Sequence, residues 1–433
     1  MKTILKIIKK SYIKVLKSIA FYPGIICIGF LMLALGALNL ESAAVLSDIK
    51  KEFPYFLITD YETARAILTT LIGGVLSLTV FSFTMVMLVL NQASSDFSPR
   101  LLPGLISNKR HQIILGIYIG SLLYCILVLI ALGANGVDSQ SLGLSTMIAA
   151  FVGVLCIGLF VYFIHNISGA VQIHNIINLI FQKSDGYLDE QWNIQKGAKL
   201  SVSTTDTDDW HTINCKDSGY FKGFDTTLLT EPLANRLSHI EVLPYLNYHL
   251  WEGMPLIKTK KEMSLEEQEG LLFCIKLSSD RHEGDKGIGG MIKLMEIAVK
   301  AMSPGINDPG TAIDAITKLG RLLRKFLKLP NVTIEKLECG VQLIRNTVTA
   351  DELMRTIVQP IRLYSKIDSV VLYELVTAIH YILRTTELSD ENKASVEREL
   401  HNFKFDIENN IENDADRLRL LKLLSGGLPL SES

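Results

Sequence analysis

Charge-free apolar runs alternate with short polar segments over the first part of the chain. The longest run, Ala66–Ala93, has twenty-eight residues without a charged side chain. A helix needs roughly 20 apolar residues to cross a bilayer, so this run is long enough. Ile19–Leu38, Ile113–Ala134 and Ser145–Ile164 are three further runs of about one bilayer thickness. The pattern therefore predicts four transmembrane helices.

The longest run also carries a stripe of small and polar residues. They recur three, four or seven residues apart, which places them near one face of a helix. The stripe consists of Thr70, Gly73, Ser77, Thr84 and Asn91, with Phe81 beside it. In a membrane, such a stripe either packs against another helix or lines a polar path. Phe81 is then either a packing residue or a constriction of that path.

Polar residues follow the second and the fourth run. After the second, Asp96, Ser98, Pro99 and Arg100 form a hinge that we expect to couple this helix to the rest of the protein. After the fourth, we expect one continuous helix that ends at Ser184-Asp185-Gly186. His165, Ser168, Gln172 and Asn175 keep near-helical spacing along it. They line a vestibule or pack among polar neighbours at the membrane surface.

The distribution of basic residues predicts the orientation in the membrane. The basic, amphipathic N-terminus (residues 1–18) and the loop after the second run hold nine Lys and Arg, against three in the other two loops. Basic loops stay in the cytoplasm, so both termini are expected there, with the protein in a bacterial inner membrane. A cleaved signal peptide is the alternative for the first run, but its length favours a retained helix.

Composition separates this region from the remainder of the chain. Residues 1–184 hold 13 Lys and Arg against 7 Asp and Glu, whereas residues 185–433 hold 30 against 38. An acidic C-terminal region argues against nucleic-acid binding. The six cysteines include no C-x-x-C pair, so we expect neither a metal site nor a disulfide framework.

The C-terminal region is predicted to contain a small β-containing module, residues 185–262, and a helical domain, residues 263–433. The module has strand-like runs at Leu200–Thr204, Gly219–Phe224 and Val242–Leu250, and a short helix at Glu231–His239. Capping boxes are expected at Thr59–Glu62, before the second transmembrane helix, and at Ser264–Glu267. The predicted helices of the domain are Ser264–Ser279, Met291–Met302, Pro309–Leu327, Thr333–Thr347, Asp351–Ser365, Ser369–Thr386, Asn392–Asn410 and Asp414–Leu424.

Ser303–Thr311 is the most suggestive segment of this domain. Two prolines and two glycines fix an unusual backbone between two helices. The segment is either a ligand, ion or partner site or a rigid connector in which Asp308 caps the next helix. Together with Arg281 and Asp285, which lie in a charged loop, its candidate site residues are Ser303, Pro304, Asn307, Asp308 and Pro309.

Three motifs together resemble a known bacterial family. They are Phe97-Ser98-Pro99-Arg100-Leu101-Leu102, Ser218-Gly219-Tyr220, and Ala301–Ala312. The chain is similar to DUF2254, a family of predicted membrane proteins named as a domain of unknown function. Of the family's Arg-Thr pair and following Asp, Arg281 and Asp285 match, but His282 stands in place of Thr. The resemblance implies four spans with an attached soluble region, and no established activity.

No enzyme motif is present: G-x-S-x-G, the P-loop and H-E-x-x-H are all missing, and no span has a charged residue near its centre. We therefore predict an α-helical integral membrane protein with a cytoplasmic α+β region, without catalytic residues, metal or cofactor. Its predicted function is a homo-oligomeric channel, or channel-like transporter, for ions or small solutes, regulated by the cytoplasmic region. A membrane-anchored sensor or scaffold without transport activity is the alternative.

Overall fold

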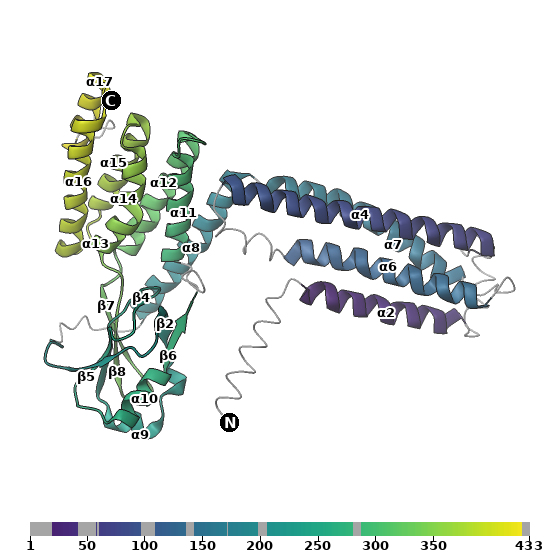
Figure 1. Cartoon of the computed structure of the whole chain (residues 1–433), viewed down its shortest axis with the longest axis horizontal. Coiled ribbons are helices and arrows are strands. Elements are labelled where there is room, and N and C mark those ends of the chain that lie inside the picture. Colours follow the sequence, from purple (N-terminus) through teal and green to yellow (C-terminus); the bar gives the residue numbers. More distant parts are fainter. Residues whose placement is uncertain are drawn as a thin grey trace. The chain divides into compact units, whose positions relative to one another are not determined.

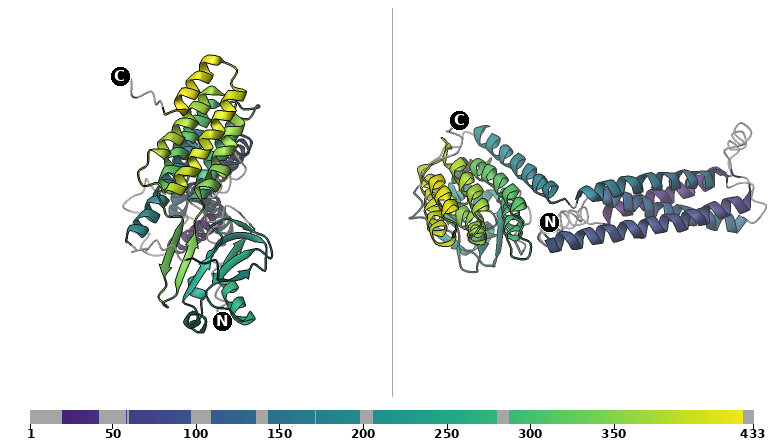
Figure 2. Two further views of the ribbon diagram at one scale, coloured as in Figure 1. Left: turned by 90° about the vertical axis from the view of Figure 1, so that its left-hand side faces the viewer. Right: turned by 90° about the horizontal axis from the view of Figure 1, so that it is seen from above.

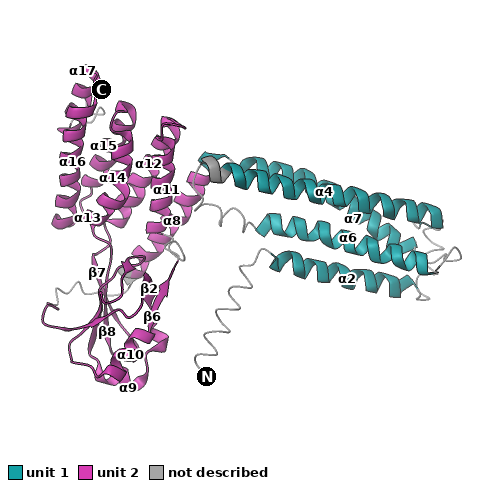
Figure 3. Ribbon diagram, in the orientation of Figure 1, with its two compact units in different colours: residues 1–175 teal, residues 176–433 magenta. Residues whose placement is uncertain are grey.

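The computed structural model describes residues 20–41, 58, 60–96, 109–135, 143–170, 172–197, 206–279 and 287–426. The chain divides into two compact units, which we call the N-terminal unit (residues 1–175) and the C-terminal unit (residues 176–433) (Figure 3). The change in charge composition along the chain predicted this division at residue 184. Leu200–Thr204, a predicted strand, lies outside the described residues.

Four long apolar helices make up the described part of the N-terminal unit (Figure 1). They are α2 (Phe21–Glu41), α4 (Tyr61–Asp96), α6 (Lys109–Asn135) and α7 (Gly143–Ala170). Each is long and apolar enough to cross a membrane, as the sequence pattern predicted. The 36 residues of α4 extend about 54 Å, well beyond the ~30 Å of a bilayer's hydrocarbon core.

Helix α6 is the centre of this unit. It packs against α2, α4 and α7, and 44% of its apolar stretch is buried, against 11% for α2 and 17% for α4. Glycines permit the close approach: a Cβ at Gly116 would lie 2.9 Å from the Cα of Pro23 on α2. Small residues between helices serve this purpose in membrane proteins.

The start of α4 corrects one expectation. Asp60 caps the helix: its carboxylate accepts hydrogen bonds from the Thr63 backbone N–H at 2.8 Å and from the Thr63 hydroxyl at 2.6 Å, while Thr59, the predicted cap, lies outside the described residues. These bonds lower the pKa of Asp60. Glu62 pairs with Arg65 at 3.1 Å. An Asp three residues before a Thr serves the free amides of the first turn equally well.

The predicted continuous helix after the fourth run is also wrong. Helix α7 ends at Ala170, Gln172 lies outside any helix, and α8 (Ile173–Gly197) begins after it. Helix α8 then passes through Ser184-Asp185-Gly186 without ending. Tertiary contacts explain this, since Ser184 packs against the backbone of Gly290, and Lys325 forms ion pairs of 2.7 Å with both Asp185 and Asp189.

The C-terminal unit contains two sheets. One has the order β1-β5-β3-β8-β7 and the other β4-β2-β6. Their strands are β1 (His211–Asn214), β2 (Gly219–Phe224), β3 (His239–Val242), β4 (His249–Leu250), β5 (Pro255–Thr259), β6 (Ile275–Ser278), β7 (Val332–Lys336) and β8 (Gln342–Asn346). Neighbouring strands are antiparallel except β3 and β8, which are parallel with Ile240 opposite Leu343.

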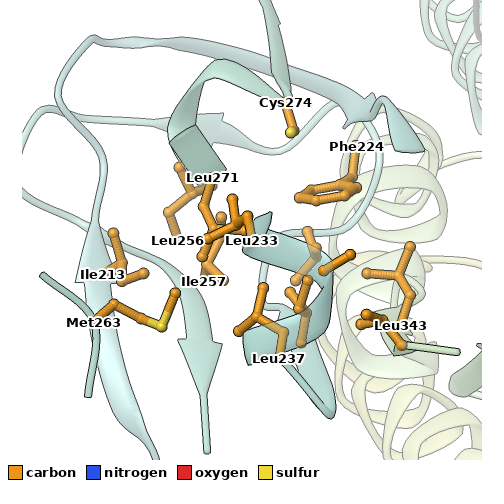
Figure 4. Packing of buried hydrophobic residues seen from close by; sticks show 14 of the residues in the cluster. Ile213, Phe224, Leu233, Leu237, Leu256, Ile257, Met263, Leu271, Cys274 and Leu343 are labelled. Carbon is orange, nitrogen blue, oxygen red and sulfur yellow. The ribbon is translucent and has the colours of Figure 1, made fainter. Parts of the chain in front are cut away.

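The sheets enclose an apolar core with two short helices, α9 (Glu231–Arg236) and α10 (Leu265–Phe273). Figure 4 shows Leu233 and Leu237, from α9 and its C-terminal end, among residues of the neighbouring strands such as Leu256 and Ile257. The predicted capping box at Ser264 and Glu267 opens α10, with both reciprocal hydrogen bonds formed. This confirms one of the two predicted boxes.

The remaining helices gather at one end of the sheets within the C-terminal unit (Figure 2), so this unit is of the α+β type. They are α11 (Ile288–Ala301), α12 (Pro309–Phe326), α13 (Ala350–Leu353), the π-helical turn η4 (Met354–Val358), α14 (Gln359–Ser365), α15 (Ser369–Leu383), α16 (Asp390–Asn410) and α17 (Asp414–Leu424). Side chains cap most of them, including Asp308, Asp368, Ser389 and Asn413.

Three predicted elements of this region are wrong. Thr333–Thr347, expected to be a helix, is the hairpin β7–β8, whose turn includes Gly340 with a φ of +83°. The helix after Ser264 ends at Phe273, and β6 follows where the helix was expected to continue. Val242–Leu250 is not one strand, because Leu243–Tyr248 separates β3 from β4. In each case pairing with a distant strand outweighs the local preference.

Candidate functional site

The stripe of α4 faces away from the rest of the N-terminal unit. The residues that α4 buries are Ala64, Leu68, Val75, Ser82 and Val89. The stripe residues, by contrast, are all exposed: Thr70, Gly73, Ser77, Phe81, Thr84 and Asn91. Successive residues of a helix turn by about 100°, which puts the stripe nearly opposite the buried face. Packing among the described residues of the N-terminal unit therefore does not explain the stripe.

The glycines of α4 support the same conclusion. Ideal Cβ atoms at Gly73 and Gly74 would meet no heavy atom within 4 Å, whereas at Gly120 of α6 a Cβ would lie 2.5 Å from the Phe30 ring. Glycine in a helix interior costs about 0.5–1 kcal/mol relative to alanine. In α6 close packing offsets this cost, and in α4 none of the described residues packs against these glycines.

Two hydroxyl groups of the stripe, those of Ser77 and Thr84, donate hydrogen bonds to backbone carbonyl oxygens of their own helix. Ser77 Oγ donates to the carbonyl oxygen of Gly73 at 2.9 Å, and Thr84 Oγ1 donates to that of Val80 at 2.9 Å. Such bonds satisfy the donor inside the helix and leave the lone pairs of the hydroxyl oxygen as the accessible polar feature. Phe81 is 48% exposed, and its ring packs edge-on against Phe160 of α7 with centroids 5.6 Å apart.

The hinge lies almost wholly outside the described residues. Asp96 is the last residue of α4, and Ser98, Pro99 and Arg100 are not among the residues described. Their coupling role therefore stays a prediction.

The vestibule residues are described, and all four are exposed. His165 and Ser168 lie on α7. Gln172 lies between the two helices and Asn175 in the first turn of α8, where Asn175 Nδ2 donates to Gly169 O at 2.9 Å and to Gln172 Oε1 at 3.2 Å. The four predicted vestibule residues are thus divided between the C-terminal end of α7 and the hydrogen-bonded start of α8.

A buried carboxylate at the end of α2 escaped the sequence analysis. Glu41 is 7% exposed, and its Oε1 accepts a 2.8 Å hydrogen bond from the backbone N–H of Ser145, in the first turn of α7. Tyr124 of α6 donates to the carbonyl oxygen of Ser145 at 3.1 Å. A carboxylate at a helix N-terminus is stabilised by the free amides and the helix dipole. The signal was present in the sequence, as a Glu directly after an apolar run.

Ser303–Thr311 forms an exposed connector between α11 and α12. Asp308 caps α12 by accepting from the backbone N–H of Thr311 at 3.1 Å and from its hydroxyl at 2.6 Å, and these bonds lower the pKa of Asp308. Asn307 has a φ of +47°, and Ser303 Oγ donates to Lys300 O at 2.6 Å. Pro304 is exposed and Pro309 occupies the first turn of α12. Arg281 and Asp285 lie outside the described residues.

The C-terminal unit also contains a cavity of about 650 Å³ that the sequence analysis missed. Its wall includes residues of α8, of the strands β2, β7 and β8, of the segment between β3 and β4, and of the start of α11. These elements span residues 187–348, so no local motif reveals the cavity. Among the described residues, no group of three or more His, Cys, Asp or Glu is placed to hold a metal ion.

Comparison with known proteins gives a family but no activity. The model of the family described as "Predicted membrane protein (DUF2254)" matches residues 17–381. Uncharacterized protein Mb1321c of Mycobacterium bovis and Uncharacterized protein Rv1290c of Mycobacterium tuberculosis are each 25% identical over 266 residues, which is 59% of this chain. The chain spans about half (49%) of the length of each relative. No solved structure matches it significantly.

Proposed function

The chain belongs to the DUF2254 family of predicted membrane proteins, and we propose that it forms a homo-oligomeric channel in which α4 borders the permeation path. The observation that carries this proposal is the exposed stripe on the face of α4 opposite its buried face. Lipid tails offer no partner to small and polar residues, whereas a second copy of the helix or a column of water does. An oligomer provides both.

The chemistry of the stripe favours cations or neutral solutes over anions. Ser77 and Thr84 have donated their hydroxyl protons to the backbone, so the groups facing outward are oxygen lone pairs. Oxygen ligands of this kind replace the hydration shell of a cation. Phe81, at the same face, is placed to narrow the path, and its contact with Phe160 holds its ring in position.

The proposed location is a bacterial inner membrane, with both chain termini and the C-terminal unit in the cytoplasm. This orientation rests on the excess of Lys and Arg in the N-terminal segment and in the loop between α4 and α6. The C-terminal unit would then regulate the channel from the cytoplasmic side.

Flux measurements on purified protein in liposomes test the proposal. We expect passage of K⁺ or Na⁺, which Ser77→Leu and Thr84→Leu reduce by about tenfold, because each replaces an oxygen ligand with a bulky apolar group. Thr69→Leu is the matched control: Thr69 is exposed and its hydroxyl also donates to the backbone, at 2.8 Å, but it lies about a quarter turn from the stripe. Absence of flux under varied voltage, tension, pH and calcium would refute the channel.

The cavity of the C-terminal unit favours a second candidate, a membrane-anchored sensor or scaffold without transport. In that case the stripe is only a contact between copies of α4. Ser77→Leu and Thr84→Leu distinguish the two. A path predicts assembled oligomers with altered conduction, and a contact predicts dissociation, which size-exclusion chromatography with light scattering measures.

A further inference from the structure

The cavity of the C-terminal unit has an apolar floor and a volume suited to a small molecule. Its floor includes the buried side chains of Leu188, Phe326, Leu329 and Val348. Small-molecule sites typically occupy about 300–1,000 Å³ and are lined mainly by apolar and aromatic groups. At about 650 Å³ this cavity falls in the middle of that range.

The charged residues of the cavity wall are mostly cationic. Lys222, Lys276 and Arg345 line it, and Glu335 is the single acid among the described lining residues. Lys276 Nζ lies 2.8 Å from Asp225 Oδ2, and Arg345 Nη2 lies 2.9 Å from Glu335 Oε2. These pairs hold the cations at the wall, and their side chains stay about half exposed. With Glu335 and Asp225 counted against the three cations, an anionic group entering the cavity meets an excess of one positive charge.

Arg345 has a donor that the described residues do not use. Its Nε is buried and has no hydrogen-bond partner among them. A buried donor without an acceptor costs free energy, more so when it belongs to a charged group. The guanidinium presents Nε–H and Nη–H as a fork that matches the two oxygens of a carboxylate or phosphate. Because Nε is covered by protein, an oxyanion in the cavity would bind Arg345 through the accessible part of its side chain, which is 42% exposed.

Aromatic side chains indicate the rest of the ligand. Tyr187 of α8, Phe221 and Phe224 of β2, and Tyr245 line the cavity, together with Phe326 on the floor. We propose that the cavity binds a small soluble molecule with an aromatic body and a phosphate or carboxylate group. The body packs on the apolar floor and against these aromatic side chains, and the oxyanion binds Arg345 and Lys276. This inference holds whether or not α4 forms a channel.

Isothermal titration calorimetry on the full chain in nanodiscs of phosphatidylcholine tests this inference. The probes are 2-naphthyl phosphate, 2-naphthoate and inorganic phosphate, with empty nanodiscs as the blank. We expect at least one naphthyl probe to bind in the micromolar range, and inorganic phosphate, which lacks the body, to bind at least about tenfold more weakly. The tighter naphthyl probe identifies the oxyanion. Binding of neither naphthyl probe overturns the proposal.

Variants locate the binding in the cavity. Arg345→Met and Lys276→Met are expected to weaken binding by at least about tenfold each, since each removes a charge-assisted hydrogen bond. Arg398→Met and Lys216→Met are matched controls, because both cations form exposed ion pairs elsewhere, with Asp351 at 3.0 Å and Glu269 at 2.7 Å. They should bind as the unaltered chain does. Unchanged binding in both cavity variants refutes the site.

A third variant separates loss of binding from loss of folding. Thr333 is half-buried at the cavity wall, opposite Arg345 on the neighbouring strand, so Thr333→Trp fills space in the cavity without removing a charged side chain. It should abolish naphthyl binding while the protein keeps its thermal unfolding midpoint. Full binding by a folded Thr333→Trp protein contradicts the proposed position of the body. These binding results are independent of flux, so failure of the channel and failure of the site are distinguishable.

Discussion

The two units of the protein differ in what they expose and what they bury. The N-terminal unit exposes large apolar side chains such as Phe151, Val154 and Met32, which are 72%, 68% and 68% accessible. The C-terminal unit also exposes single apolar side chains, such as Leu265 at 81%, but it adds exposed charged pairs such as Arg398–Asp351, and it buries an ionic cluster. Each surface matches a different solvent, lipid for the first unit and water for the second.

The exceptions to this contrast are the functional candidates. On the apolar exterior of the N-terminal unit, the stripe of α4 is polar. Inside the C-terminal unit, the cavity leaves apolar and cationic groups uncovered. The stripe is polar where the surrounding exterior is apolar, and the cavity is open where the surrounding interior is packed. Such local departures are where binding is expected.

The largest effect is expected from the ionic cluster. Arg362 Nε donates to Glu399 Oε1 at 2.8 Å, and Arg362 Nη1 pairs with Asp406. All three side chains are nearly inaccessible. Arg362→Met leaves two buried carboxylates without their cation and should lower the free energy of unfolding by about 3–5 kcal/mol. Fluorescence of the three tryptophans measures this in urea, because all lie after residue 175.

Arg398→Met is the control for this first prediction. It removes an arginine from an exposed ion pair of the same unit, which is worth at most about 1 kcal/mol. Equal destabilisation by the two variants would contradict the contrast between buried and exposed charge in this unit.

A lysine on the exterior of each unit tests the two solvents directly. Val154 of α7 and Leu418 of α17 are equally accessible, at 68% and 67%. A charged residue at the centre of a membrane helix costs about 2.5–3.5 kcal/mol, so Val154→Lys should sharply reduce the yield of inserted, folded protein. Leu418→Lys should leave the yield unchanged. Similar yields from both variants would show that α7 does not face lipid.

Glycine substitutions compare the two kinds of surface within the N-terminal unit. Gly116→Val introduces a side chain 2.9 Å from the backbone of Pro23, and such overpacking costs about 1–3 kcal/mol. Gly73→Val, where a Cβ has open space, should preserve the monomer's fold and reduce oligomer formation. Recovery of monodisperse protein after heating measures the first effect, and light scattering the second. If Gly73→Val leaves the oligomer unaltered, the stripe does not lie in the interface between copies of the chain.

The smallest effect concerns the ion pair at the cavity wall. Lys276 and Thr227 lower the pKa of Asp225 from its ordinary 3.8 to about 2. Because the folded-state pKa is depressed, the stabilisation is complete above pH 3.8 and disappears as the pH falls towards 2. Asp225→Asn should therefore lower stability by on the order of 1 kcal/mol at pH 7, and by progressively less below pH 4. Tryptophan fluorescence measures this, and in a Lys276→Met background the difference should shrink.

Sequence periodicity was sufficient where structure is local. The four apolar helices follow from charge-free runs, and Asp308 and Ser264 were predicted to open helices because capping involves residues only three positions apart. The spacing of the residues also identified the stripe on one face of α4, but spacing cannot show whether that face packs against the other helices of the chain. That required knowing that α6 occupies the opposite side.

Long-range features were beyond such reasoning. The β7–β8 hairpin contains residues that suit a helix as well, and its strand character is decided by pairing with β3, about a hundred residues earlier. The cavity, likewise, collects Tyr187, Phe221 and Arg345 from three separate stretches. Arg362 lies in an unremarkable helical pattern, and its carboxylate partners follow some forty residues later.

The parallel pairing of β3 with β8 has a consequence for synthesis of the protein. Ribosomes deliver β3 about a hundred residues before β8, so during translation β3 has one unpaired edge that is open to other chains. By then the four apolar helices have already been made, and insertion into the bilayer would tether the growing chain and keep nascent copies apart. A protein cut short before Gln342 would lack that partner strand permanently, which makes such fragments prone to aggregation and to clearance by proteases.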